Sequence, residues 1–332
     1  MTFPMLADVL AAKQAIRGIA IETPLVPSPA LSAGAGCEVL LKLETMQPVG
    51  AFKIRGAANA MAHLPPESRK RGVACCSTGN HGRGVAYAAR HFGVRAIVCL
   101  SKLVPDVKVD AIKALGAEVR RIGDSQDDAQ VEVDRLVASE GMTDLHPFDH
   151  PHVIAGQGTI GLEILTERPD TETIVVPLSG GGLFAGIALA AKAIKPSIRM
   201  IGVSMARGAA MIESLEAGKP VEVVELPTLA DSLGGGIGLA NRWTFALCRQ
   251  LADHTLTLSE TEIYRGMRAL FLEDRLVTEG GGAVGAAALI AGRLALEGPT
   301  ALVVSGRNVD MTKFLSIARG EPVTIGDMIV SI

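Results

Sequence analysis

The chain has 332 residues, of which 48% are hydrophobic and 3% aromatic, and its formal net charge at pH 7 is −3. This length can bury a core for one large or two medium domains, and the near-neutral charge without long basic runs excludes nucleic acid or an anionic membrane as a standing partner. The five cysteines are odd in number and lack C-x-x-C spacing, so we expect no disulfide framework or zinc site, a cytoplasmic protein, and a small-molecule partner.

Residues 1–18 predict an amphipathic helix interrupted by Asp8 and Lys13, without the basic leader and apolar block of an export signal. Beyond it, apolar or β-branched runs alternate with alanine-rich helical patterns. The runs are GVACCST (72–78), RAIVCLS (95–101), EVRRIG (118–123), TIVVPLSGG (173–181) and MIGVS (200–204). This alternation predicts an α/β fold with largely parallel sheets covered by helices. The uncharged run 173–191 approaches membrane-span length, but Pro177 and a central glycine cluster favour a strand, a tight loop and a helix.

Ligands of such sheets usually lie beyond the carboxyl ends of the strands. Polar or glycine-rich loops occupy these places: STGNHG (77–82), SGGGL (179–183), ADSLGGGIG (230–238), TEGGGAVG (278–285) and SGRNVD (305–310). The SGGGL loop opens a predicted helix, whose free N–H groups and dipole favour a phosphate. A glycine turn needed only for packing is an alternative. Dinucleotide binding through Gly180-x-Gly182-x-x-Ala185 is another, but the next strand ends at Ser204 without the carboxylate that a ribose requires.

One lysine, Lys53, lies in the apolar and small-residue segment VGAFKIRGAANA (49–60). An apolar environment favours the neutral amine, which can attack an aldehyde. A lysine whose stem covers the surface is the alternative. Together with a phosphate loop, the segment suggests a phosphorylated aldehyde cofactor that is held as a Schiff base.

The motifs AFKIRGA, CSTGNHG, the glycine loop and VVSGRNVD stand in the order found in pyridoxal-phosphate enzymes of fold type II. Over nearly its whole length the chain resembles the threonine and serine dehydratases and serine racemase. The resemblance implies pyridoxal 5′-phosphate as cofactor, a homodimer, and two domains, each with a largely parallel sheet covered by helices, as in the β subunit of tryptophan synthase. It implies a large cofactor-binding domain of residues 1–65 and 150–332 and a small domain of residues 66–149.

The resemblance also assigns roles to single residues. Lys53 becomes the Schiff-base lysine and general base, and Thr78 the second catalytic residue. The expected cofactor contacts are Phe52, Lys53, Asn80, Ser179, Gly180, Gly181, Gly182, Leu183, Glu279 and Ser305. The expected substrate contacts are Ser77, Thr78, Gly79, Asn80, His81, Ser232, Gly235 and Arg307. A hydroxyl at Ser305, in place of a carboxylate, leaves the pyridine nitrogen largely neutral and favours β-elimination over long-lived carbanions.

Departures from the family pattern narrow the expectation. Thr78 stands where serine racemase has its acid/base serine, which makes racemisation doubtful. Ser204 and Ala210 replace the acidic residues of relatives that bind a structural cation, so we expect no metal. The histidines of the segment HPFDHPH (146–152) are interpreted as structural.

Arg307 stands where most relatives have glycine. With STGNHGR, SKLVPDVKV and TLADSLGGGIG, the loop SGRNVD resembles the hydroxyectoine utilisation dehydratases. The prediction is therefore β-elimination of a 3-hydroxy-2-amino acid from hydroxyectoine breakdown, giving an enamine or imine and then an oxo acid and ammonia, with a possible coupled imine reductase. The alternatives are a general threonine/serine ammonia-lyase, an amino-acid racemase, an NAD-dependent dehydrogenase and a catalytically silent amino-acid sensor.

Overall fold

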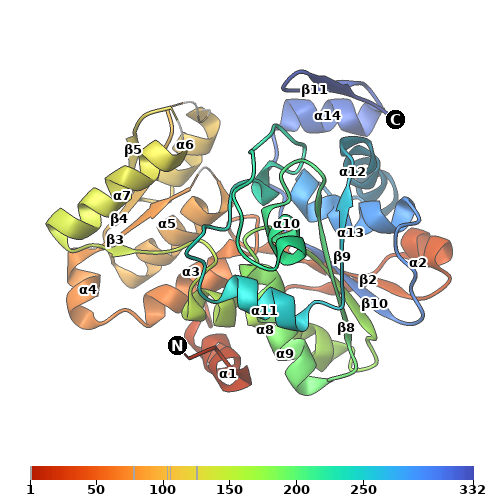
Figure 1. Cartoon of the computed structure of the whole chain (residues 1–332), viewed down its shortest axis with the longest axis horizontal. Coiled ribbons are helices and arrows are strands. Elements are labelled where there is room, and N and C mark those ends of the chain that lie inside the picture. Colours follow the sequence, from red (N-terminus) through yellow and green to blue (C-terminus); the bar gives the residue numbers. More distant parts are fainter. Residues whose placement is uncertain (1, 78, 103, 105, 125) are drawn as a thin grey trace.

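The computed structural model describes residues 2–77, 79–102, 104, 106–124 and 126–332, and these form two helix-covered sheets (Figure 1). The larger sheet has six strands in the order β1 (Leu25–Pro27), β2 (Val39–Leu43), β10 (Thr300–Val304), β7 (Thr173–Pro177), β8 (Arg199–Met205) and β9 (His254–Leu258). Only its β1–β2 pair is antiparallel. The predicted α/β fold with largely parallel sheets is thereby confirmed.

The smaller sheet has four parallel strands in the order β5 (Glu118–Arg121), β4 (Ala96–Leu100), β3 (Val73–Cys76) and β6 (Thr143–Asp144). Its helices are α4 (Pro66–Arg71), α5 (Asn80–Phe92), α6 (Asp106–Lys113) and α7 (Gln126–Glu140). All of these elements lie between residues 66 and 144. The exact domain boundaries, 65/66 and 149/150, stay a prediction.

Helices cover both faces of the larger sheet because its strands carry apolar side chains on both sides. On β2, Val39, Leu41 and Leu43 contribute to one core and Leu40 to the other, as the period of two in a strand requires. The first core lies under α2 (Pro29–Ala35), α12 (Glu260–Asp274), α13 (Gly280–Ile290) and α14 (Met311–Arg319). The second lies under α8 (Pro151–Glu167), α9 (Gly182–Ile194), α10 (Ala210–Ala217) and α11 (Thr244–Leu251).

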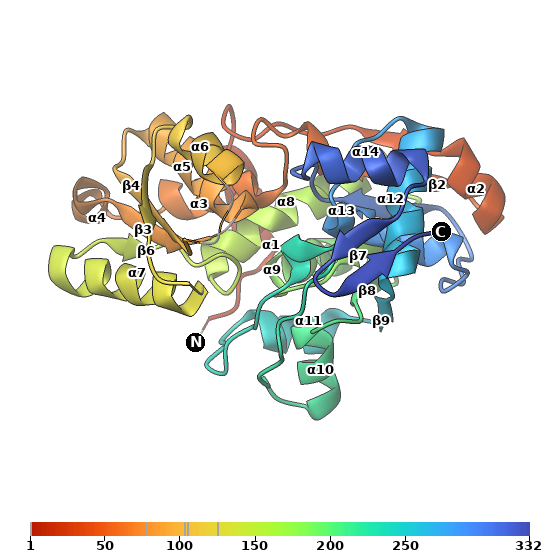
Figure 2. The same cartoon turned by 90° about the horizontal axis from the view of Figure 1, so that it is seen from above.

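The remaining elements join or flank the two sheets. They are α1 (Leu6–Ala15), α3 (Lys53–Ala62), the 3-10 turns η1 (Glu44–Met46) and η2 (Asp231–Leu233), and the hairpin β11 (Val323–Ile325) and β12 (Met328–Val330). Helix α3 packs on both α5 and α8, so it lies where the two units meet (Figure 2). The run 173–191 forms β7, a loop and α9, as expected. No helix in the described ranges is long and apolar enough to cross a membrane.

Candidate functional site

The N-terminus of α3 meets the end of β10, and this contact joins segments that are far apart in the sequence. The Phe52 N–H donates to the Ser305 carbonyl over 3.1 Å, and Ala51 forms a bridge with Gly306. Strands β2 and β10, which lead to these residues, pair in parallel. Lys53, the first residue of α3, is therefore held at the carboxyl edge of the larger sheet.

The Lys53 amine lies in an environment that favours its neutral form. Its Nζ donates to the Pro147 carbonyl over 2.8 Å and lies 5.5 Å from the Phe52 ring centroid and 6.0 Å from that of Phe148. Burial lowers the pKa of Lys53 to about 8, and the Glu279 carboxylate opposes part of this shift. The amine is thus a far better nucleophile and base at neutral pH than an ordinary lysine.

The glycine loop provides a buried helix N-terminus. Gly181 has a φ of +88° and precedes α9, and no side chain caps this end of the helix. A Cβ on Gly181 would lie 2.7 Å from Met211 Cε, and a Cβ on Gly180 would overlap the Phe148 ring. Gly180 and Leu183 are buried, whereas Ser179 is half-buried. Backbone N–H groups without helical partners therefore converge where only glycine fits, which suits a phosphate.

Asn80, the first residue of α5, connects the two units through its side chain. Its Nδ2 donates to Glu279 Oε1 over 2.8 Å, and its Oδ1 accepts from Asn308 Nδ2 over 2.6 Å. Asn308 also accepts from Arg83 Nη1 over 2.8 Å and donates its backbone N–H to Glu279 Oε2 over 3.1 Å. Asn80 and Glu279 were predicted from the sequence as site residues, whereas Asn308 and Arg83 were not. Asn308 nevertheless belongs to the motif SGRNVD, and Arg83 belongs to the motif STGNHGR.

Glu279 is a buried carboxyl group close to Lys53. Burial raises the pKa of Glu279 to about 7, the charge of Asp231 adds to the rise, and hydrogen bonds from Asn80 and Ser232 oppose it. The carboxyl group is therefore shared between its protonated and ionised forms near neutral pH.

The other candidate residues around α5 have defined partners. Ser77 Oγ accepts the backbone N–H groups of Gly79, over 3.2 Å, and Gly82, over 2.9 Å. Burial lowers the pKa of His81 to about 3, so the neutral ring donates from Nε2 to the Leu145 carbonyl over 2.6 Å. Ser77 and His81 thus shape the loop between β3 and α5. Thr78 lies outside the described residues.

The candidates from the C-terminal half lie at different depths. Ser305 is 2% exposed and directly follows β10, where its carbonyl accepts the Phe52 N–H. Ser232 is exposed and Gly235 half-buried in the segment 230–238. Arg307 is exposed; its backbone N–H donates to the Gly50 carbonyl over 2.9 Å, and within the described ranges its guanidinium makes no hydrogen bond or ion pair.

The segment 146–149 contributes to the site more than the sequence analysis expected. Pro147 provides the acceptor for Lys53, and Phe148 covers Gly180. The carboxylate of Asp149 accepts three backbone N–H groups of residues 242–244 and so caps α11. His146 Nδ1 accepts the Asp149 N–H over 2.9 Å, which agrees with its structural interpretation. The position of this segment in the sequence could have indicated its role, because it follows β6, and binding sites of parallel sheets lie beyond the carboxyl ends of their strands.

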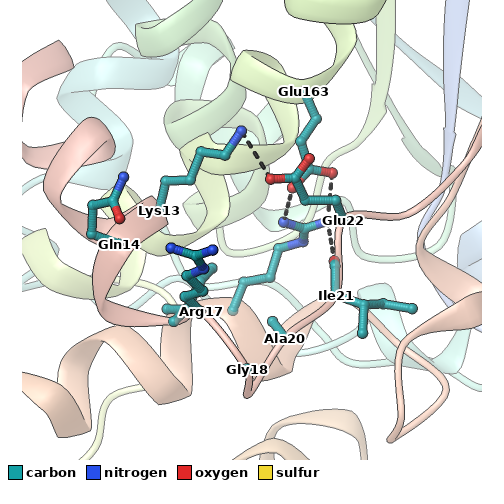
Figure 3. A pocket seen from close by; sticks show the side chains of 10 residues that line it. Lys13, Gln14, Arg17, Gly18, Ala20, Ile21, Glu22 and Glu163 are labelled. Carbon is teal, nitrogen blue, oxygen red and sulfur yellow. Dashed lines mark hydrogen bonds and ion pairs between the residues drawn. The ribbon is translucent and has the colours of Figure 1, made fainter.

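Behind Lys53 lies a network of buried charges. Arg55 pairs with Glu44 over 2.8 Å and with Glu163 over 2.5 Å, and Lys42 pairs with Glu163 over 2.6 Å. A cavity of about 480 Å³ opens onto Arg55 and Glu163, and Lys13 at its rim pairs with Glu22 over 2.9 Å (Figure 3). The network joins β2, η1, α3 and α8.

Taken together, these groups fit a phosphorylated aldehyde. A neutral-leaning amine can bind the aldehyde, and an uncapped, buried helix N-terminus can bind the phosphate. The buried hydroxyl group of Ser305 could form a hydrogen bond with a ring nitrogen. Among the residues that the structure describes, no group of three or more histidine, cysteine or acidic side chains is arranged to hold a metal ion.

Comparison with known proteins shows the same similarity over almost the whole chain. A family model described as "pyridoxal-phosphate dependent enzyme" matches residues 16–306. The chain is 52% identical over 316 residues to a putative threonine dehydratase of Sinorhizobium fredii, with 95% of each chain covered. It is 40% identical over 307 residues to the L-threonine ammonia-lyase of Thermotoga maritima, covering 92% of this chain and 76% of that relative. Maize serine racemase superposes with a TM-score of 0.90 at 32% identity, covering 95% of this chain and 97% of that one.

Proposed function

The chain belongs to the family of pyridoxal-phosphate-dependent enzymes, and from this premise we propose that it is a threonine ammonia-lyase that also accepts related 3-hydroxy-2-amino acids. The carrying observation is the Lys53 amine, whose pKa of about 8 suits both attachment to an aldehyde and proton transfer. Similarity to the Sinorhizobium and Thermotoga relatives supports the reaction class. Membership of this family argues against the nicotinamide-dependent alternative. Similarity to a named ammonia-lyase favours an enzyme over a catalytically silent amino-acid sensor.

In the proposed site, the N–H groups of Gly180, Gly181, Gly182 and Leu183 bind the cofactor phosphate, with Ser179 at the edge of the loop. Phe52 would lie against the cofactor ring, Asn80 and Glu279 would orient it, and Ser305 would donate to or accept from its nitrogen. When bound, pyridoxal phosphate supplies an aldehyde for the substrate amine and a ring that withdraws electrons from Cα.

The chain's own residues would carry the remaining steps. The loop between β3 and α5 would hold the substrate carboxylate with backbone N–H groups at the start of α5. Ser232, which hydrogen-bonds Glu279, and Gly235 are the proposed substrate contacts in the segment 230–238. The neutral Lys53 amine takes the Cα proton. The β-hydroxyl leaves as water with a proton that the protonated Lys53 can return, and the product is released as an enamine. The enamine tautomerises to an imine, which a water molecule hydrolyses to an oxo acid and ammonia. The catalytic role of Thr78 stays a proposal.

The decisive test uses cofactor-loaded enzyme with threonine and serine, and measures oxo acid and ammonia. We expect both products, with threonine preferred, because the curated relatives above are named for threonine. The Lys53→Ala variant should lose at least about 10²–10⁴-fold in turnover together with the visible absorption of the covalently held cofactor. Lys192→Ala, which removes a half-buried lysine of α9 that pairs with Asp253, is the matched control. No ammonia from any hydroxyamino acid would refute the proposal, and serine epimerised without ammonia would favour a racemase.

A finer version assigns the chain to hydroxyectoine breakdown, with a homodimer and a coupled imine reductase. Its support is the SGRNVD loop, in which the Arg307 guanidinium stays exposed and without an ion-pair partner in the described part of the chain. On this version, a polar hydroxyamino acid derived from hydroxyectoine has a higher kcat/KM than threonine, and Arg307→Gly reverses the order. A wild-type preference for threonine contradicts it.

A further inference from the structure

Phe148 presents an apolar ring that the hydrophobic cores do not use. It is half-buried, and within the described residues it belongs to none of the hydrophobic clusters of either sheet. Its ring covers Gly180 and makes an edge contact with His146 at 4.7 Å between centroids. The Lys53 amine lies 6.0 Å from its centroid. An apolar side chain thus borders the reactive amine without a role in the core.

We propose that Phe148 is a specificity-determining residue: its ring is the wall against which the β-methyl group of a threonine-type substrate packs. The inference rests on the proposed function and names the substrate feature that the site selects. It concerns the side chain of the substrate, whereas Lys53 and the glycine loop concern the cofactor.

The distances place the ring within reach of the substrate side chain. In the reaction, the substrate amine takes the position that the Lys53 amine holds on the cofactor aldehyde. Atoms two and three bonds from that nitrogen extend about 2.5 and 3.8 Å from it. Because Nζ lies 6.0 Å from the ring centroid, a methyl group on Cβ reaches van der Waals contact with the ring.

The surroundings of Phe148 favour an apolar group over a charged one. Burial lowers the pKa of His146 to about 4, so this neighbour is neutral at pH 7. The carboxylate of Asp149 is occupied by the three N–H groups at the start of α11. The Lys53 amine, 6.0 Å from the ring centroid, is itself shifted toward its neutral form. The wall therefore favours the binding of a substrate methyl group and provides no ion-pair partner for a charged substrate side chain.

Phe245 provides a matched control. It is the second residue of α11, it is 8% exposed, and it packs in the core on the same side of the larger sheet as the glycine loop. Its ring contacts the Arg249 guanidinium at 5.5 Å from the centroid. Phe245→Leu removes a comparable aromatic ring from α11 without touching the wall.

The experiment measures kcat/KM for threonine and for serine in the wild type, Phe148→Leu, Phe148→Ala and Phe245→Leu. Because one buried methyl group corresponds to about a fourfold preference, the threonine-to-serine ratio should fall about fourfold in Phe148→Ala and less in Phe148→Leu. It should stay within about twofold of the wild type in Phe245→Leu. A ratio unchanged in both Phe148 variants overturns the inference.

A binding measurement separates this inference from the proposed function. Calorimetry gives the Kd values of 2-aminobutyrate and alanine, which differ by the same methyl group. Because both lack the β-hydroxyl group, their binding measures the contact with the wall without turnover. The ratio of the two Kd values should shrink about fourfold in Phe148→Ala. If the wild type released no ammonia, the proposed function would fail while this ratio still tested the wall. If Phe148→Ala did not fold, Phe148→Leu would decide by the same two ratios.

Discussion

Lys53 shows how neighbours at the residue scale set the chemistry of one amine. With a pKa of about 8, roughly one amine in ten is neutral at pH 7, against about one in two to three thousand for a lysine with the ordinary pKa near 10.4. The cause is burial between the Pro147 carbonyl and two aromatic rings, which stabilises the charged form less than water does. Glu279 acts in the opposite direction.

A pH series of cofactor loading tests this environment. The rate at which pyridoxal phosphate attaches to the cofactor-free protein should rise with pH and level off above about 8, because only the neutral amine reacts. For an unperturbed lysine the rise would continue past pH 10. The growth of visible absorption measures the rate.

Glu279→Gln supplies the matched variant for that series. Since the Glu279 carboxylate raises the Lys53 pKa, its removal should move the midpoint to lower pH. A midpoint that stays in place, or moves upward, would show that the carboxylate does not act on the amine.

At the element scale, α3 is anchored by charges rather than only by apolar packing. Arg55, Lys42, Glu44 and Glu163 are each at most 6% exposed, and their charges sum to zero. Burying such groups is costly unless each charge keeps its partners, so the set is sensitive to the loss of one member. Because Arg55 lies two residues after Lys53, the network also fixes the first turn that carries the reactive amine.

Glu163→Gln should therefore lower the free energy of unfolding by about 3–5 kcal/mol, since it leaves Lys42 and Arg55 facing one carboxylate. Urea titration with a constant m-value measures the change. Glu67→Gln, which breaks the exposed pair with Lys70, is the control and should have little effect. Equal effects of both variants would contradict the buried network.

Acid supplies an independent check on the same network. The arginine and lysine partners hold the pKa of Glu163 below its ordinary value in the folded protein, although burial alone would raise it. Its contribution to stability is thus complete above the unfolded-state pKa of about 4.3 and is lost as the pH falls through the lower, folded-state value. The wild type should therefore lose more stability than Glu163→Gln as the pH falls from 5 to 3, which urea titrations at each pH measure.

The elements themselves were predictable because each signal was local. The apolar runs became β3, β4, β5, β7 and β8, and the SGGGL loop opens α9 as its glycine content indicates. Contacts across the chain were not predictable in the same way. Arg83 and Asn308 are 225 residues apart, and neither motif by itself predicts that their side chains are in contact. The placement of the exposed Arg307 likewise depends on the hydrogen bond from its backbone N–H to Gly50, a residue far away in the sequence.

On the scale of the whole molecule, one group of polar side chains ties the two sheet units together at the site. Asn80 and Arg83 come from α5 beside the smaller sheet, and Asn308 and Glu279 come from loops of the larger one. The Asn308 side chain also donates to the Val49 carbonyl over 2.9 Å, near the start of α3. The contact between the units depends on these hydrogen bonds, and on the proposed function the orientation of the cofactor depends on them as well.

Asn308→Ala should weaken cofactor binding about tenfold or more, because it removes several hydrogen bonds of about 0.5–1.5 kcal/mol each. Titration of pyridoxal phosphate into the cofactor-free protein, followed by its absorption, gives the Kd. Lys108→Ala breaks a different contact between the units, the 3.1 Å pair with Asp231, and should leave the Kd nearly unchanged. A similar loss in both variants would assign the effect to the contact between the units in general.

The pairing of β2 with β10 also limits how early the site can form while the protein is being synthesised. Ala51 and Phe52, which directly precede Lys53, cannot make their contacts with β10's end until Ser305 and Gly306 have been made. At translation rates of about 5–20 residues per second, the wait is roughly ten seconds to a minute. During that interval the start of α3 is not yet held at the carboxyl edge of the larger sheet. We therefore expect that a chain ending before residue 305 does not retain pyridoxal phosphate, so that cofactor retention would report that translation has passed this point.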